Sequence, residues 1–216
     1  MTRKTRILLK MLAWAGCLVP LAVLVWHAAN GTMGADPAAR IASVTGRTAL
    51  WLLAATLAIT PVRRLIPQLG WLGQFRRLAG LFVFFYATLH LAAYVALYAG
   101  FDPRAILDDV ARRRFILAGV ATWLALLPLA ATSTQAAIRR LGGKRWNRLH
   151  RLVYLAGVFA LAHYWWKVKP GVLSPVPFTV VLVLLLAARP ALGWLEQRRK
   201  ASLRAVAVGV PSGQSS

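Results

Sequence analysis

Acidic residues and cysteine are both scarce in this chain of 216 residues, and their scarcity excludes several classes of protein. Asp and Glu number 5 against 27 Lys and Arg, so the formal net charge is +22, yet only 15% of the residues are charged. A soluble domain carries about 25% charged residues, which argues against a soluble enzyme. The single cysteine, Cys17, excludes an internal disulfide, a CxxCH haem attachment site and a cysteine-ligated iron–sulfur cluster or zinc finger. We interpret Cys17 as a small apolar helix residue.

The chain is rich in apolar residues, because hydrophobic residues make up 59% of it. A membrane-spanning helix needs about 20 mostly apolar residues, within a range of about 17–25. Runs that meet or approach this length are residues 7–27, 45–60, 78–99, 115–132, 149–166 and 176–194, with Pro61 closing the second. The sequence therefore predicts an all-α integral membrane protein with six transmembrane helices in residues 1–200 and a flexible cytoplasmic tail over residues 201–216.

The orientation of these helices follows from the basic residues between them. Lys and Arg concentrate in the segments that share a side with the N-terminus. Because cytoplasmic loops carry the excess of Lys and Arg, both termini are predicted to be cytoplasmic. The first run begins after basic residues, as a signal peptide does. Its apolar part exceeds the usual core of roughly 7–15 residues, however, so we interpret it as a helix that stays in the membrane.

Two of the four histidines are the strongest candidates for function, because ionisable side chains inside a span are costly. Counted from the cytoplasmic ends of the third and fifth runs at 1.5 Å per residue, His90 lies about 18 Å and His163 about 21 Å into the membrane. Both runs cross in the same direction, so the two imidazoles share one depth. Two imidazoles so placed can bind the iron of a haem from both faces. The alternative is that each is a hydrogen-bonded packing residue.

The other two histidines are weaker candidates. His150 lies about 20 Å below His163, which is the spacing a second, inner haem requires, but an ideal helix rotates its side chain by about 140° from the face of His163. The residue fourteen before His90 is Arg76, which cannot ligate iron. Three roles therefore stay open for His150: it is the single ligand of an inner cofactor, it contacts a quinone or flavin, or it is an interfacial residue. His27 is interpreted as an interface residue.

Arginines near the ends of the spans are candidate partners for anionic cofactor groups. Arg47, near the outer end of the second run, suits a haem propionate, although a membrane-edge arginine is an equal alternative. Arg76 and Arg77 open the third run on the cytoplasmic side. They suit an inner propionate or a flavin phosphate, but the cytoplasmic excess of basic residues also explains them.

Several segments, taken together, are similar to a known family. They are Thr45-Gly46-Arg47-Thr48, Arg77-Leu78-Ala79-Gly80-Leu81, Tyr86-Ala87-Thr88-Leu89-His90, Thr132-Ser133-Thr134-Gln135, Trp146-Asn147-Arg148-Leu149-His150-Arg151 and His163-Tyr164. Over about residues 34–169 the chain resembles the MsrQ (YedZ) haem-binding membrane subunits, a family of ferric-reductase-like transmembrane proteins. Any one of these segments alone is weak, whereas the set is specific.

The resemblance implies a ferric-reductase-like bundle in the bacterial inner membrane that holds b-type haem, with FMN also attributed to the family. It implies electron transfer from the quinone pool or a cytosolic flavin reductase to MsrP, a periplasmic molybdenum-cofactor subunit that reduces methionine sulfoxide in oxidised envelope proteins. His90, His150 and His163 match the family's histidines, whereas Arg76 stands where larger relatives have a second histidine. One haem is therefore expected, a second is left open, and FMN is assigned no residues.

Two other functions stay open. One is a cytochrome b-type ferric or quinone reductase that works without MsrP. The other is a small proton or metal transporter, although its spans would contain almost no acidic residues, which proton relays normally use. The chain also has no GxGxxG fingerprint and no room for a nucleotide-binding domain, so an electron carrier of this length must receive its electrons from a partner.

Overall fold

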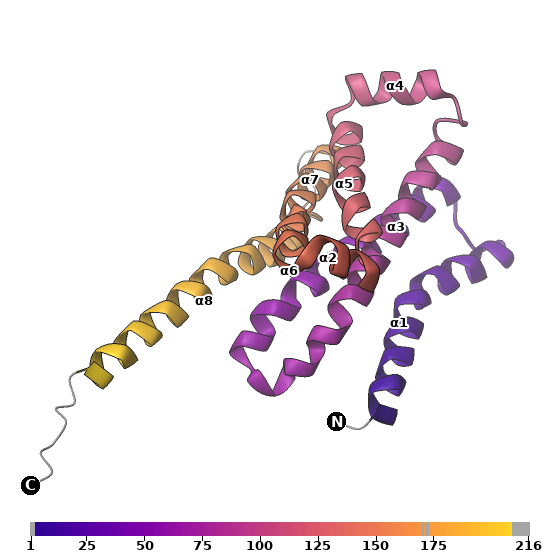
Figure 1. Ribbon diagram of the computed structural model, residues 1–216. Helices are drawn as coiled ribbons and strands as arrows, with labels where there is room; N and C mark the ends of the chain where they lie inside the picture. Colours follow the sequence, from indigo (N-terminus) through magenta and orange to yellow (C-terminus); the bar gives the residue numbers. More distant parts are fainter. Residues whose placement is uncertain (1–2, 170, 172, 209–216) are drawn as a thin grey trace, which may run out of the picture.

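The computed structural model describes residues 3–169, 171 and 173–208, and all of its regular secondary structure in these ranges is helical (Figure 1). The elements are α1 (Arg3–Ala29), α2 (Pro37–Leu65), the 3-10 helix η1 (Pro67–Phe75), α3 (Arg76–Leu97), α4 (Pro103–Arg112), α5 (Arg114–Ala131), α6 (Gln135–Leu149), α7 (Leu152–Lys167) and α8 (Val176–Val208). The predicted all-α class is confirmed.

Five helical stretches of the described chain are long and apolar enough to cross a membrane: α1, α2, η1 with α3, α5, and α8 as far as Leu195. The chain is thus a multi-pass membrane protein. α7 is not among the five, because its 16 residues extend only about 24 Å at 1.5 Å per residue, against a hydrocarbon core of about 30 Å. The sixth span and the cytoplasmic position of the termini stay predictions.

Helix ends differ from the predicted boundaries for local reasons. α2 begins at Pro37, well before the apolar run, because the Asp36 carboxylate accepts a hydrogen bond from the Ala39 N–H at 2.8 Å and caps the helix. It also continues past Pro61 to Leu65, since proline lacks only its own N–H and the residues after it keep theirs. α8 continues to Val208, into the segment expected to be a flexible tail, whose residues 209–216 lie outside the described ranges.

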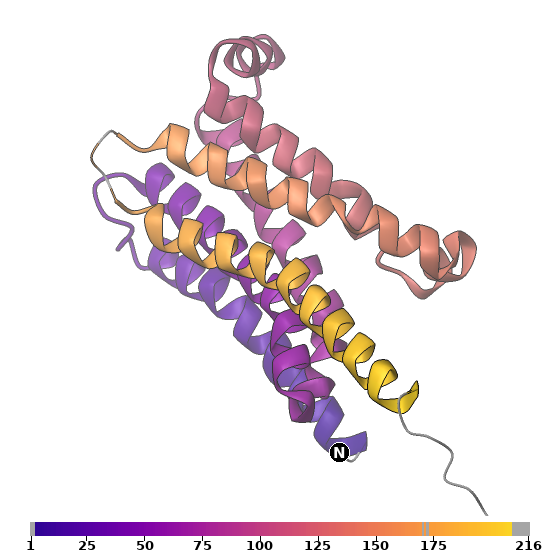
Figure 2. The same ribbon diagram turned by 90° about the vertical axis from the view of Figure 1, so that its left-hand side faces the viewer.

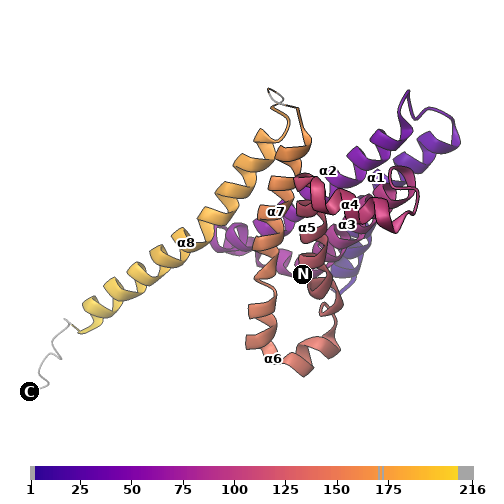
Figure 3. The same ribbon diagram turned by 90° about the horizontal axis from the view of Figure 1, so that it is seen from above.

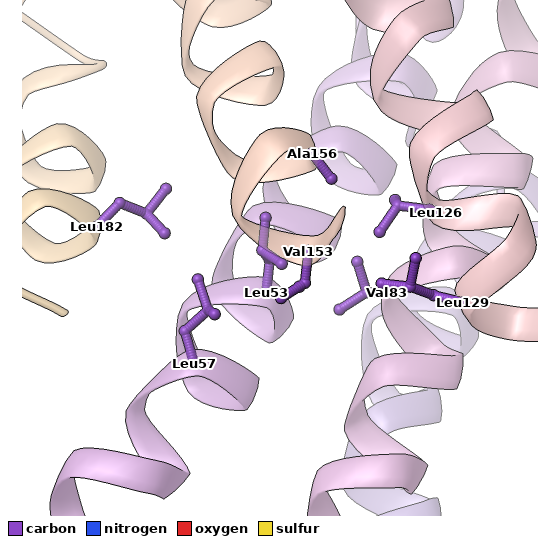
Figure 4. Packing of buried hydrophobic residues seen from close by; sticks show 8 residues of the cluster. All are labelled: Leu53, Leu57, Val83, Leu126, Leu129, Val153, Ala156 and Leu182. Carbon is purple, nitrogen blue, oxygen red and sulfur yellow. The ribbon is translucent and has the colours of Figure 1, made fainter. Parts of the chain in front are cut away.

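The core of the bundle lies between α2, α3, α5, α7 and α8. Its buried side chains are Leu53, Leu57, Val83, Leu126, Leu129, Val153, Ala156 and Leu182 (Figure 4). Figure 2 shows α5 and α7 side by side in one row, with α8, α2 and α1 in a second row. The C-terminal half of α8 extends away from the bundle (Figure 3). This arrangement places α3 and α7, the helices that carry His90 and His163, on either side of the interior.

α1 packs on the edge of the bundle and is tied to α3 by one buried hydroxyl. The Tyr86 side chain of α3 is fully buried; its hydroxyl donates to the Cys17 carbonyl at 2.7 Å and accepts from the Leu21 N–H at 3.2 Å. These two backbone groups are i and i+4 partners in a regular helix, and Pro20 lies between them. Tyr86 therefore bridges α1 at its proline, one turn before His90.

Candidate functional site

The two histidines that share a depth in the sequence face each other in the structure. The imidazole of His90 on α3 and that of His163 on α7 have ring centroids 5.8 Å apart and ring planes at 87°. Both side chains are partly buried by the surrounding helices. The interior between α3 and α7 is thus lined by two imidazoles that approach from opposite sides.

A backbone carbonyl on a neighbouring helix orients each ring. His90 Nδ1 lies 2.9 Å from the Ala42 carbonyl oxygen of α2, and His163 Nδ1 lies 2.6 Å from the Phe115 carbonyl oxygen of α5. A carbonyl only accepts, so each Nδ1 carries the proton and donates it. In the neutral imidazole this tautomer leaves the lone pair on Nε2, where it can bind a metal.

A glycine lets each imidazole ring lie close to the neighbouring helix whose carbonyl accepts its hydrogen bond. Gly46 follows Ala42 by one turn on α2, and a Cβ atom there would lie 3.1 Å from His90 Cε1 and Nδ1. Gly119 follows Phe115 by one turn on α5, and its Cβ atom would lie 2.9 Å from His163 Nδ1. The same arrangement, a carbonyl at position i and a glycine at i+4, thus occurs on both sides of the site.

The two imidazoles can supply only two ligands to a metal ion, so they fit a metal whose other ligands come from a cofactor. Among the described residues, no group of three or more His, Cys, Asp and Glu side chains is arranged to hold a metal ion. Two opposed imidazoles, with metal–nitrogen bonds of about 2 Å each, suit an ion whose remaining positions are filled by a macrocycle such as haem. With both axial positions taken by imidazole, such an iron has no open site and is suited to electron transfer.

His150 lies in the turn between α6 and α7, away from the histidine pair. Its ring stacks on Trp146 with centroids 3.7 Å apart, and Nδ1 lies 3.1 Å from the Trp146 carbonyl oxygen. Nε2 is buried and has no hydrogen-bond partner. His150 and Arg151 form a turn rather than part of a helix, and α7 begins only at Leu152.

The same end of the bundle holds a cavity of about 450 Å³ that includes His150 in its wall. Basic side chains line it from several elements: Lys10, Arg63, Arg76 and Arg77. Trp146, Ser133 and Thr56 add an aromatic face and two hydroxyls. A buried imidazole nitrogen without a partner, next to cationic walls, fits an anionic planar group or a quinone headgroup.

Of the three candidate arginines, two line the cavity and one is exposed. Arg76 and Arg77 line this cavity together with His150. Arg47, one residue after Gly46, is exposed. His27 ends α1, where its Nδ1 lies 2.8 Å from Thr32 Oγ1, and takes part in neither site.

Sequence reasoning missed four residues that shape the histidine pair. Ala42 and Phe115 act through their carbonyls, which no side-chain pattern reveals. Gly46 was noticed only as part of a motif, and Gly119 was not noticed. The available signal was a glycine inside an apolar span, where glycine costs about 1 kcal/mol relative to alanine and needs a packing reason.

Comparison with known proteins gives a consistent result. Residues 45–161 match the family described as ferric reductase like transmembrane component. The chain is 41% identical over 194 residues to a Ralstonia nicotianae protein, covering 89% of each chain, and 45% identical over 187 residues to one from Xanthomonas axonopodis pv. citri, covering 83% and 84%. A Herminiimonas arsenicoxydans protein is 39% identical over 198 residues, covering 91% and 90%. All three are described as protein-methionine-sulfoxide reductase haem-binding subunit MsrQ. No solved structure matches the chain.

Proposed function

Because the chain belongs to the MsrQ family of ferric-reductase-like transmembrane proteins, we propose that it is the haem-binding membrane subunit of a protein-methionine-sulfoxide reductase. It carries electrons through the membrane to a periplasmic partner that reduces methionine sulfoxide. The observation that supports this most is the opposed pair of His90 and His163, whose rings are 5.8 Å apart with both Nδ1 atoms held by backbone carbonyls.

His90 and His163 hold a b-type haem through their Nε2 atoms. When bound, the haem iron accepts and releases single electrons. The protein fixes both imidazoles in one tautomer through the carbonyls of Ala42 and Phe115, so neither ring has to reorient when the iron changes charge.

A second cofactor would bind in the basic cavity around His150. The unpaired Nε2 of His150 and the arginines 76 and 77 support an inner haem, a flavin or a quinone headgroup there. Such a group would take electrons from the quinone pool or a cytosolic flavin reductase and supply them to a haem held by His90 and His163.

The partner on the outer side is a molybdenum-cofactor subunit of the MsrP type. His163 lies four residues from Lys167, the last residue of α7, which is about 6 Å along the helix axis. The outer haem is therefore close to the periplasmic surface. The loops on that side are too short to bind a protein substrate, so the sulfoxide chemistry takes place on the partner.

The membrane topology that fits this function has six spans, with both termini in the cytoplasm of the bacterial inner membrane. α7 is the short span, and its packing along α5 supports a transmembrane position. His163 on α7 then shares its depth with His90 on α3, as binding to one iron requires.

The test is a reduced-minus-oxidised absorption spectrum of the detergent-purified protein, with haem extracted and counted per chain. We expect a bis-histidine b-type spectrum in the wild type and loss of most of the outer haem in His90→Ala and in His163→Ala. His27→Ala is the matched control and should keep its haem. Full haem retention in either single variant would contradict the pairing, and a colourless wild type expressed with adequate haem would favour the transporter.

A second measurement separates the MsrQ role from that of a ferric or quinone reductase. Reduced protein is mixed with the periplasmic molybdenum-cofactor subunit and a peptide containing methionine sulfoxide. Oxidation of the haem that depends on both additions supports the proposed function. Reoxidation by ferric chelates alone, with no response to the subunit, would favour the alternative.

A further inference from the structure

α4 is a helix that the electron-transfer function does not use. Pro103–Arg112 lies across the outer ends of α3 and α5 and is nearly perpendicular to α5 (Figure 1). The chain turns into it through Gly100 and Phe101, which have φ angles of 59° and 60°. Phe101 is a non-glycine residue in the left-handed region, which costs roughly 1–2 kcal/mol, so the turn is held by its surroundings.

The two long sides of α4 differ in chemistry. Apolar residues recur at helical spacing as Pro103, Ile106, Leu107 and Val110, whereas the other side carries Arg104, Asp108 and Arg112. Ile106 and Val110 are partly buried against the bundle. Leu107 continues the same apolar side outward and is 69% exposed.

Exposed apolar side chains also occur on the segments that adjoin α4. Phe101, 71% exposed, precedes α4, and Leu97 at the end of α3 and Leu117 at the start of α5 are 48% and 52% exposed. Leu97 and Leu117 belong to helices that are long and apolar enough to span a membrane, in which exposed side chains meet hydrocarbon. A bilayer is therefore a better match than a protein for exposed apolar side chains on α4 and on the helices that it joins.

The basic residues of α4 are arranged for phosphate groups. Asp108 pairs with Arg112 at 3.6 Å and Asp109 with Arg113 at 2.9 Å. Within the described part of the chain, neither Arg104 nor Arg114 forms a salt bridge with a carboxylate. The cytoplasmic excess of basic residues does not explain arginines at the outer end. An amphipathic helix with arginine beside its apolar side is typical of helices that lie in the membrane–water interface.

We propose that α4 lies in the outer membrane–water interface, with Leu107 and Phe101 inserted among acyl chains and Arg104 and Arg114 bound to the phosphates of lipid headgroups. The position of α4 bears on the histidine pair. The Tyr94 hydroxyl, one turn after His90 on α3, donates to the Asp109 carboxylate at 2.8 Å. Phe115, whose carbonyl holds His163, follows α4 within three residues. The lipid-bound helix thus fixes the outer ends of α3, which carries His90, and of α5, whose Phe115 carbonyl holds His163.

The experiment measures the depth of α4 in the full-length protein, with Cys17→Ala as the background. A nitroxide spin label is placed at Leu107→Cys and, as the matched control one residue away on the polar side, at Asp108→Cys. The proteins are reconstituted into phosphatidylcholine vesicles with or without phosphatidylglycerol. Collisions of the label with oxygen, which concentrates in hydrocarbon, are compared with collisions with a water-soluble nickel chelate.

We expect the ratio of oxygen to nickel accessibility to be several-fold higher at position 107 than at position 108. Equal ratios, with nickel reaching both labels freely, would overturn the proposal. If nickel reaches position 107 in vesicles and loses access only when the periplasmic reductase is added, the occupant is a protein and the proposal is wrong. The readout does not depend on haem, so it can fail while the proposed function holds.

A second pair of variants tests the headgroup contacts. Arg104→Gln combined with Arg114→Gln is expected to abolish any increase in the depth ratio at position 107 that phosphatidylglycerol produces. Arg113→Gln, whose side chain pairs with Asp109, is the control and is expected to keep that increase. An unchanged lipid dependence in the double variant would contradict phosphate binding by Arg104 and Arg114.

Discussion

Gly119→Ala is the substitution that tests most directly how the histidine pair is built. The new Cβ atom would lie 2.9 Å from His163 Nδ1 and 3.1 Å from Cε1, whereas ordinary contacts begin at 3.4 Å. The distance from Cβ to Nδ1 must therefore grow from 2.9 Å to at least 3.4 Å, so the imidazole has to move by about 0.5 Å. The ring cannot move away from α5 without lengthening its 2.6 Å hydrogen bond to the Phe115 carbonyl.

The expected magnitude follows from the loss of this orienting contact. Loss of a hydrogen bond that orients a metal-binding histidine typically weakens metal affinity about 10–100-fold, which is about 1.4–2.7 kcal/mol. Overpacking of a helix interface costs a similar amount, about 1–3 kcal/mol. We therefore expect haem to dissociate from Gly119→Ala about 10–100 times faster than from the wild type.

The assay is transfer of haem from the purified protein to an excess of apomyoglobin, followed by absorption. Gly157→Ala on α7 is the matched control, because a Cβ atom there meets nothing within 4 Å and alanine favours the helix. Gly46→Ala, with its closest ring atoms at 3.1 Å, should show an intermediate effect. Wild-type dissociation from Gly119→Ala would refute the reasoning, and an equal loss in Gly157→Ala would assign the effect to general helix packing.

Three further predictions concern other parts of the molecule. His150→Ala should keep the outer haem but slow reduction from the cytoplasmic side, measured by stopped-flow with a flavin reductase; normal kinetics would leave His150 an interfacial residue. Tyr86→Phe should destabilise the junction of α1 and α3 by about 1–3 kcal/mol, because it leaves the Cys17 carbonyl and the Leu21 N–H without their bridge; unchanged hydrogen exchange in α1 would disprove this. Asp102→Ala removes the cap that accepts from the first turn of α4 at 2.9 Å and should cost about 1 kcal/mol, seen as faster hydrogen exchange confined to α4.

The sequence predicted the histidine pair because depth in a membrane can be counted along the chain. Each residue of a helix advances 1.5 Å, and the apolar runs mark where a span begins and ends. His90 and His163 therefore share a depth whatever the detailed packing of the bundle. The N-terminal caps of α2 and α4 also depend only on neighbouring residues in the sequence. Asp36-Pro37 and Asp102-Pro103 each start a helix through contacts with their own backbone.

The inner site could only be partly predicted, because the local path of the chain departs from an ideal helix. The sequence predicts one continuous helix over residues 149–166, whereas the structure has a turn at His150 and Arg151 between α6 and α7. Only the structure brings His150, in the turn between α6 and α7, to one cavity with Arg76 and Arg77 of α3. The structure also makes α7, at 16 residues, shorter than the apolar run of residues 149–166 that predicted it.

The sequence by itself determined the class of protein, its apolar spans and the depth of the candidate ligands, because these depend on composition and on distance along one helix. The tertiary structure decided which way each helix is turned about its axis. That rotation comes from packing between helices, and it selects the carbonyls of Ala42 and Phe115, the close approach at Gly46 and Gly119, and the position of α4 across the bundle. A one-dimensional pattern fixes depth, and only contacts between helices fix direction.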